Sequence, residues 1–192
     1  MNKAVFLDRD GNIIHDPGYL SDLKKFRFYK NSVKGLKLLQ DSGFKLIVLT
    51  NQSGVARGFY GEDFVKATHK YMDKLLAAHN VKIDAYYYCP HHVDAQVKKY
   101  KMDCECRKPK TGMIDMAVKK FKIDLKQSWS IGDKLTDVKL GKNAGTKTVL
   151  VLTGKGKKQV LKIESKTKPD IISANLYSAA KKITAGLKTE DK

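Results

Sequence analysis

The sequence predicts an α/β fold, a doubly wound and mostly parallel sheet with helices on both of its faces. Short apolar segments of strand length alternate along the chain with longer segments whose apolar residues have helical spacing. Three of the strand segments end in polar residues, namely Asp8 and Asp10, Thr50 and Asn51, and Asp133. Because parallel strands have their carboxyl ends at one edge of a sheet, we expect these side chains to converge there.

The individual elements follow from apolar runs and from the residues that bound them. Short apolar runs between polar or glycine-containing turns predict strands at residues 4–7, 44–49, 83–88, 128–131, 147–152 and 171–172. Helical spacing, polar caps and terminal glycines predict helices at about residues 32–43, 63–79, 111–121, 135–143 and 176–187. We find no internal repeat and no dividing linker. We therefore expect one domain over residues 1–187, without a large cap domain, and a flexible tail at 188–192.

Composition places the chain among ordinary globular proteins. Of its 192 residues, 42% are hydrophobic and 30% are charged. No segment approaches the roughly 20 consecutive apolar residues of a membrane-spanning helix. The N-terminus leads directly into an expected core strand and lacks a signal-peptide pattern. These features predict a cytoplasmic protein that has no membrane association.

The net charge of +18 requires an explanation of its own. It is compatible with nucleic acid, an anionic membrane surface or a small anionic substrate as the partner. The lysines are spread along the chain, and the lysine-rich segment 155–168 lacks the interleaved aromatic residues of a base-stacking platform. A solvated basic surface explains the charge equally well. We therefore expect a small anionic substrate, no nucleic acid, and a monomeric protein.

The segment Asp8-Arg9-Asp10-Gly11 follows the first strand and offers two carboxylates to the expected crevice. Such a pair can supply a nucleophile, a neighbouring acid or base, and hard oxygen ligands for a divalent cation. Asp and Gly also favour ordinary turns, so the segment alone is equally compatible with a polar turn. The convergence of polar residues from other strand ends favours the catalytic interpretation.

The three cysteines all lie between positions 89 and 106, which favours a metal site over a disulfide framework. Two pairs of similar spacing, Cys89 with His91 and Cys104 with Cys106, form the Cys₃His ligand set of a structural zinc site. Buried cysteines can instead act as small hydrophobic residues, but these lie in a polar, charged loop. His92 is a rival ligand, and the matching spacing of the two pairs favours His91.

The expected zinc loop, residues 89–106, directly precedes Arg107 and Lys108. Four protein ligands leave the zinc no open coordination position, so we expect a structural role for it and not a catalytic one. A metal that fixes the loop also fixes the direction of the two cations that follow. We therefore expect zinc to orient Arg107 and Lys108 toward a substrate.

Taken together, four motifs resemble the haloacid dehalogenase superfamily of phosphohydrolases. They are Asp8-Arg9-Asp10, Thr50, Lys108, and Gly132-Asp133 with Asp137. The resemblance implies that Asp8 forms an aspartyl-phosphate and that Asp10 transfers protons. It further implies that Thr50 and Lys108 stabilise the transferred phosphoryl group. Mg²⁺ would be held by Asp8, the backbone carbonyl of Asp10, and Asp133.

A narrower pattern resembles the zinc-containing branch of this superfamily that acts on heptose bisphosphates. The pattern consists of the Gly18-Tyr19 loop, Thr50-Asn51-Gln52-Ser53-Gly54, Cys-Pro-His-His, and Cys-x-Cys-Arg-Lys-Pro. It implies removal of the C7 phosphate of a heptose 1,7-bisphosphate during synthesis of nucleotide-activated heptose for bacterial surface polysaccharide. It also implies that the substrate is contacted by Asp16, Pro17, Gly18, Tyr19, Asn51, Gln52, Ser53, Arg107, Lys108 and Lys134.

Two alternatives remain open at this point. A closely similar zinc-containing branch hydrolyses histidinol phosphate, and the motifs alone do not separate the two substrates. The second alternative is a basic, zinc-bearing binding module without activity, which the full set of acidic and basic site residues argues against.

At Lys134 the chain departs from many members of the superfamily, which carry a second Asp after the metal-binding acid.

Overall fold

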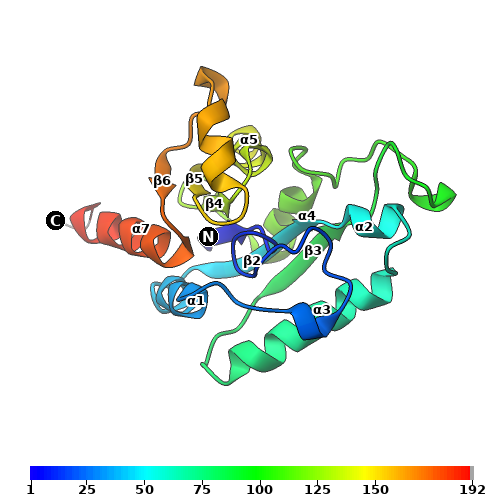
Figure 1. Cartoon of the computed structure of the whole chain (residues 1–192). Coiled ribbons are helices and arrows are strands. Elements are labelled where there is room, and N and C mark those ends of the chain that lie inside the picture. The colour runs from blue at the N-terminus through cyan, green and yellow to red at the C-terminus, as the bar shows by residue number, and fades with distance from the viewer. Residues whose placement is uncertain (191–192) are drawn as a thin grey trace.

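Six parallel strands form the sheet at the centre of the fold (Figure 1). In this computed structural model, which describes residues 1–190, the strands are β1 (Ala4–Leu7), β2 (Lys45–Asn51), β3 (Ala85–Cys89), β4 (Trp129–Gly132), β5 (Lys147–Val151) and β6 (Ile171–Ser173). Their order in the sheet is β3-β2-β1-β4-β5-β6, and each neighbouring pair is parallel. The predicted α/β class is confirmed, and the pairs between these strands are entirely parallel.

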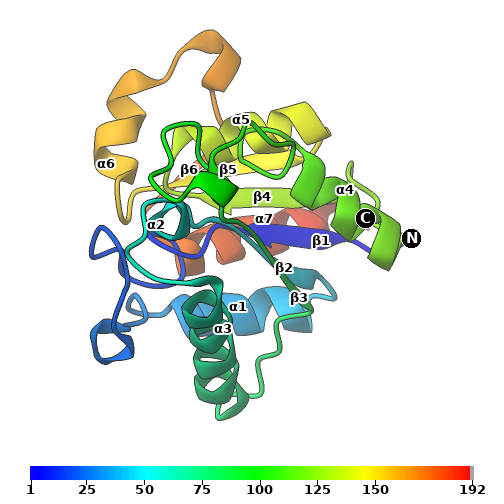
Figure 2. The same cartoon turned by 90° about the vertical axis from the view of Figure 1, so that its right-hand side faces the viewer.

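Both faces of the sheet are apolar, and each is covered by its own layer of helices (Figure 2). Val5 and Leu46 belong to the apolar cluster that contains residues of α1 (Ser32–Asp41), α3 (Glu62–Ala77) and α7 (Leu176–Glu190). Phe6 and Ile47, the next residues along the same strands, belong to the cluster with α4 (Gly112–Phe121) and α5 (Leu135–Ala144). Successive strand residues point to opposite faces, so buried strands of this kind are apolar throughout.

Most predicted elements agree with the structure to within about two residues at each end. The short helices α2 (Ser53–Ala56) and α6 (Gly156–Gln159) were not predicted, because four residues are too few to show a periodic pattern. Helix α7 extends to Glu190, so the expected tail is helical up to that residue, and 191–192 lie outside the described residues. Within residues 1–190, no helix has the length and apolar character that crossing a membrane requires.

Strand β1 lies inside the sheet, with β2 and β3 on one side and β4, β5 and β6 on the other. The chain first builds β2 and β3 on one side of β1, and then β4, β5 and β6 on the other. The connection from β3 to β4 therefore crosses from one side of the sheet to the other. This connection carries the segment 89–106 and then α4, and it passes the carboxyl ends of β1 and β2, where open α/β sheets bind ligands.

His69 of α3 is buried against the face of β3. Its ring stacks on that of Tyr86 with the centroids 4.3 Å apart, and its Nε2 atom is buried without a hydrogen-bond partner. Burial, reinforced by the positive charge of Arg9, lowers the pKa of His69 from 6.5 to about 3. The folded protein therefore keeps His69 neutral at pH values where the unfolded chain takes up a proton.

We predict that this neutral histidine makes stability depend on pH. The contribution of His69 to the free energy of unfolding is fully present above about pH 6.5. It is lost as the pH falls toward 3, because the unfolded state binds one more proton than the folded state in that range. One proton corresponds to a slope of up to about 1.4 kcal/mol per pH unit in the free energy of unfolding. Urea denaturation of the parent and of His69→Gln across this range should give a shallower slope for the variant. Identical slopes would contradict the prediction.

Candidate active site

A cleft of about 400 Å³ lies at the carboxyl edge of the sheet. Its lining includes Asp8 and Asp10 and, except for Pro17, every residue that we expected to contact the substrate or to stabilise the phosphoryl group. Asp133 is fully buried and lies beneath the cleft surface. The structure therefore brings together residues that are far apart in the sequence, such as Asp8 and Lys134.

Lys108 joins two buried carboxylates at the floor of the cleft. Its Nζ atom lies 2.8 Å from Asp8 Oδ1 and 2.6 Å from Asp137 Oδ1, and it also donates to the Leu49 carbonyl at 2.9 Å. Burial acts to lower the pKa of Lys108, but the charges of Asp137 and Asp8 outweigh it and raise that pKa. Burial acts to raise the pKa of Asp8, but Lys108 and Lys134 bring it below its ordinary value. Asp8 is therefore an ionised carboxylate at neutral pH.

Asp133 adds a second acid next to Asp8. Burial and the negative charge of Asp8 raise the pKa of Asp133 to about 7. Asp133 Oδ2 accepts a hydrogen bond from the Lys155 backbone N–H at 2.7 Å, whereas Asp133 Oδ1 and Asp8 Oδ2 have no hydrogen-bond partner. The only cation near these two atoms among the described ion pairs is Lys134, whose Nζ lies 3.5 Å from each.

This acidic cluster fits a hard divalent cation. Asp8, Asp133 and Asp137 each offer an oxygen atom, and these atoms lie within 4.8 Å of one another. Two of the oxygens are buried without hydrogen bonds, and the cluster is open to the cleft through Asp8. Mg²⁺ prefers carboxylate oxygens and retains positions for water or phosphate oxygens. The donor set therefore matches the expected Mg²⁺ site at Asp8 and Asp133, and the Asp10 carbonyl remains a predicted ligand.

Two glycines allow the neighbouring loops to close over Asp133. A Cβ atom on Gly11 would lie 2.3 Å from Asp133 Oδ2, and one on Gly154 would lie 2.2 Å from the same atom. Both residues have a positive φ, +93° and +52°, which L-residues with side chains rarely adopt. Thr153 Oγ1 donates to the Gly11 carbonyl at 2.7 Å and joins the two loops. The two loops that close over Asp133 thus need glycine for both space and backbone conformation.

Asp10 lies at the cleft surface beside Asp8, with 16% of its side chain exposed. Arg9 holds its carboxylate with both Nε and Nη2, at 3.0 to 3.2 Å. Gln52 Nε2 donates to Asp10 Oδ2 at 2.8 Å and to Thr50 Oγ1 at 2.7 Å. Tyr60 in turn donates its hydroxyl hydrogen to Gln52 Oε1 at 2.9 Å. The carboxylate expected to transfer protons is therefore fixed by a network of buried or partly buried groups.

The segment that carries the two expected cations is tied to β2. Asn51 Nδ2 donates to the Lys108 carbonyl at 3.2 Å, and Asn51 Oδ1 accepts from the Lys108 N–H at 3.1 Å. Arg107 Nη1 donates to the His91 carbonyl at 3.0 Å while its side chain lines the cleft. Asn51, which we expected to contact substrate, thus also fixes the backbone of Lys108.

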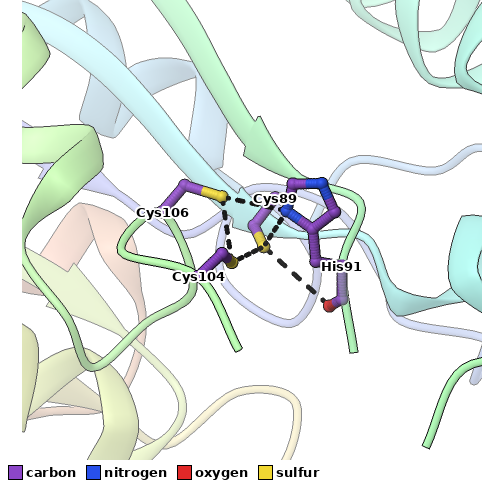
Figure 3. Close-up of side chains that lie close together, drawn as sticks. All are labelled: Cys89, His91, Cys104 and Cys106. Atoms are coloured by element: carbon purple, nitrogen blue, oxygen red, sulfur yellow. Dashed lines mark hydrogen bonds between the residues drawn. The ribbon is translucent and has the colours of Figure 1, made fainter. Parts of the chain in front are cut away.

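The four expected zinc ligands lie close together and point toward one another (Figure 3). The Sγ atom of Cys104 lies 3.4 Å from that of Cys89 and 3.3 Å from that of Cys106, and His91 Nδ1 lies 3.5 Å from Cys106 Sγ. A tetrahedral Zn²⁺ with Zn–S bonds of about 2.3 Å needs ligands spaced similarly. The rival residue, His92, instead accepts the backbone N–H of Asp94 at Nδ1. The geometry thus fits a Cys₃His zinc site that includes His91.

The zinc loop is anchored to the rest of the protein by a partly exposed acid and two tyrosines. Glu62 at the start of α3 accepts hydrogen bonds from the hydroxyls of Tyr88 and Tyr100, both at 2.7 Å. These bonds hold the pKa of Glu62 below its ordinary value. Tyr100 lies within the loop and Tyr88 on β3, so Glu62 connects the middle of the loop to the edge of the sheet.

The cleft is also lined by four residues that were not predicted from the sequence, namely Leu20, Tyr60, Thr136 and Lys155. Lys155 could have been found, because it follows a strand at the same carboxyl edge as the acids. Tyr60 follows a four-residue helix and shows no periodic signal. Its position depends on how the chain turns after β2, which residue spacing does not specify.

Known proteins provide an independent comparison. A family model described as HAD-hydrolase-like matches residues 105–179. The D-glycero-beta-D-manno-heptose-1,7-bisphosphate 7-phosphatase of Haemophilus influenzae is 47% identical over 156 residues, 81% of this chain and 84% of the relative. The protein of the same name from Haemophilus ducreyi is 43% identical over 176 residues, 91% of this chain and 94% of the relative.

A solved structure agrees with these relatives. The D,D-heptose 1,7-bisphosphate phosphatase from B. bronchiseptica, complexed with magnesium and phosphate, matches with a TM-score of 0.85 at 28% identity. The match covers 96% of this chain and 99% of that chain. Fold and site together define a haloacid-dehalogenase-like hydrolase. Within that class, the chain belongs to the family of D-glycero-beta-D-manno-heptose-1,7-bisphosphate 7-phosphatases.

We predict one tightly bound zinc per chain. Elemental analysis of protein purified without chelators should give about one zinc per chain, and Cys104→Ser should lower this content strongly because a thiolate ligand is lost. Removal of zinc should weaken phosphatase activity, and added Mg²⁺ should not restore it, because Mg²⁺ prefers oxygen ligands. Zinc-free protein with full activity would contradict the prediction. His92→Gln, which changes the rival histidine, should retain the zinc.

Proposed function

We propose that this protein removes the C7 phosphate of D-glycero-beta-D-manno-heptose 1,7-bisphosphate, a reaction of nucleotide-activated heptose synthesis. The family relationship supports the substrate, and the ionised Asp8 at the floor of a cationic cleft supports the chemistry. The observation that carries the proposal is the convergence of Asp8, Lys108 and Asp133 at the strand ends.

Asp8 is the nucleophile in this proposal. Its carboxylate attacks phosphorus and forms an aspartyl-phosphate, which water then hydrolyses. Lys108 and Lys134 place two ammonium groups within 3.5 Å of Asp8, where they reduce repulsion between the carboxylate and the phosphate dianion. Mg²⁺, when bound by Asp8 and Asp133, would add further positive charge and orient the phosphate oxygens. Thr50 would donate its hydroxyl to a transferring oxygen.

Asp10 transfers protons in both halves of the reaction. It gives a proton to the sugar oxygen as the phosphate leaves, and later takes one from the attacking water. Its place at the cleft surface beside Asp8 suits both steps. The sugar would contact the loop at Asp16, Gly18 and Tyr19, since these residues line the cleft, whereas Pro17 does not.

The test compares substrates directly. Phosphate release in the presence of Mg²⁺ should be faster from the β anomer of heptose 1,7-bisphosphate than from the α anomer or from histidinol phosphate, and ³¹P NMR should show that the C1 phosphate remains. Asp8→Asn should abolish turnover while leaving the unfolding temperature and zinc content close to those of the parent. A clear preference for histidinol phosphate would refute the proposed substrate but not the phosphatase chemistry.

Arg107 provides a second prediction, about recognition. Only one phosphate of a bisphosphate can meet Asp8, so the other lies away from it, and Arg107 at the cleft rim can bind that group with its forked guanidinium. Arg107→Ala should lower kcat/KM for the bisphosphate by about 10- to 100-fold, as expected for a lost charged hydrogen bond. For p-nitrophenyl phosphate the loss should be much smaller.

Lys108→Ala is the matched control for Arg107→Ala. Lys108 contacts Asp8 directly, so its loss should reduce activity toward both substrates. Equal losses on both substrates for Arg107→Ala would show that this residue serves the transferred phosphate and not the second one.

A further inference from the structure

Arg9, between the two acids of the first motif, is a buried charge without a role in the mechanism above. The residue is 2% exposed and is among the largest fully buried side chains of the described chain. It does not line the cleft, so it does not reach the substrate. A buried guanidinium is costly unless it is paired and hydrogen-bonded. The contacts of Arg9 must therefore account for the burial of its charge.

The guanidinium of Arg9 has a single acidic partner among the described ion pairs, the Asp10 carboxylate. Nε donates to Oδ1 at 3.2 Å, and Nη2 donates to Oδ1 at 3.1 Å and to Oδ2 at 3.0 Å. A planar fork of this kind fixes both the position and the rotation of a carboxylate. A lysine at the same position could supply the charge but not the fork.

Within the described part of the chain, no other side chain accepts a hydrogen bond from the Arg9 guanidinium. On its other side, Nη1 is buried without a hydrogen-bond partner. His69, whose pKa the charge of Arg9 helps to lower, is kept neutral and so adds no second positive charge beside the guanidinium. Asp10 has further support from Gln52, which donates to Oδ2 at 2.8 Å from within the cleft. Arg9 thus fixes Asp10 from the buried side, and Gln52 fixes it from the cleft side.

We propose that Arg9 is a positioning residue that holds the Asp10 carboxylate in the orientation needed for proton transfer. The inference rests on the role proposed for Asp10 and extends it to a residue that never touches the substrate. Proton transfer depends strongly on the distance and angle between the groups, and small misplacements cost about 10²-fold. Loss of the fork should therefore slow the steps that need Asp10 and leave substrate binding largely unchanged.

The two half-reactions separate this role from a structural one. With p-nitrophenyl phosphate the leaving group departs without needing a proton, so only hydrolysis of the aspartyl-phosphate requires Asp10. Arg9→Met should therefore release a burst of about one nitrophenolate per chain at a rate near that of the parent. The following steady rate should be about 10- to 100-fold slower, and acid quenching should trap the phosphorylated protein. The KM for heptose bisphosphate should change little compared with kcat.

A double-substitution cycle tests whether Arg9 acts through Asp10. In Asp10→Asn protein, addition of Arg9→Met should cause no further loss of the hydrolysis rate, because residues that act as one unit are not additive. Arg9→Lys keeps the charge and should still be impaired, and it serves if Arg9→Met fails to fold. Arg27→Met is the control, because this exposed arginine donates to the Lys24 and Phe26 carbonyls and does not line the cleft, so it should have parental kinetics.

The outcomes distinguish this proposal from the proposed function. Parental kinetics in Arg9→Met or full activity in Arg9→Lys would overturn the positioning role, as would an equally slowed burst and steady rate. An added loss in the Asp10→Asn background would show that Arg9 supports the site in some other way, which also overturns the proposal. If the parent itself formed no phosphorylated protein and hydrolysed no phosphate ester, the proposed function would be the part that fails.

Discussion

The crowding of negative charge at the carboxyl ends of β1 and β4 is the constraint on which the site depends. Asp8, Asp133 and Asp137 lie too close to be ionised together without cations between them. Lys108 supplies one such cation, and its ion pairs join Asp8, the residue after β1, to Asp137 of α5. Removing Lys108 would leave Asp8 and Asp137 without the cation that they share, and breaking a buried ion pair in this way typically costs about 3–5 kcal/mol.

Much of the surrounding structure serves to bring Lys108 to that position. The lysine comes from the crossover between β3 and β4 and not from a strand end. Its backbone is paired with the Asn51 amide, and the loop before it carries the Cys₃His cluster and is held to α3 by Glu62. The Cys₃His cluster thus helps to hold Lys108 near the acids, although none of its four residues lines the cleft.

The features that could be predicted from the sequence depend on local periodicity or on a simple rule of topology. The strands are apolar because helices cover both faces of the sheet, and the acids converge because parallel strands end at one edge. The Cys₃His set was expected from its spacing. The choice of His91 over His92 agrees with a contact that spacing does not reveal, the hydrogen bond between His92 and the Asp94 backbone. Tyr60, Thr136 and the fork of Arg9 likewise depend on the paths of loops and on side-chain orientation.

The crossover from β3 to β4 also carries two neighbouring cations, Arg107 and Lys108, that are held by different contacts. Besides following the zinc loop, Lys108 is bound directly to Asn51 and Leu49 of β2 and to Asp8. Arg107, one residue earlier, is oriented from the other side by the His91 carbonyl. A shift of the loop backbone at His91 would therefore move Arg107 directly, whereas Lys108 would still be held by its contacts with β2 and Asp8.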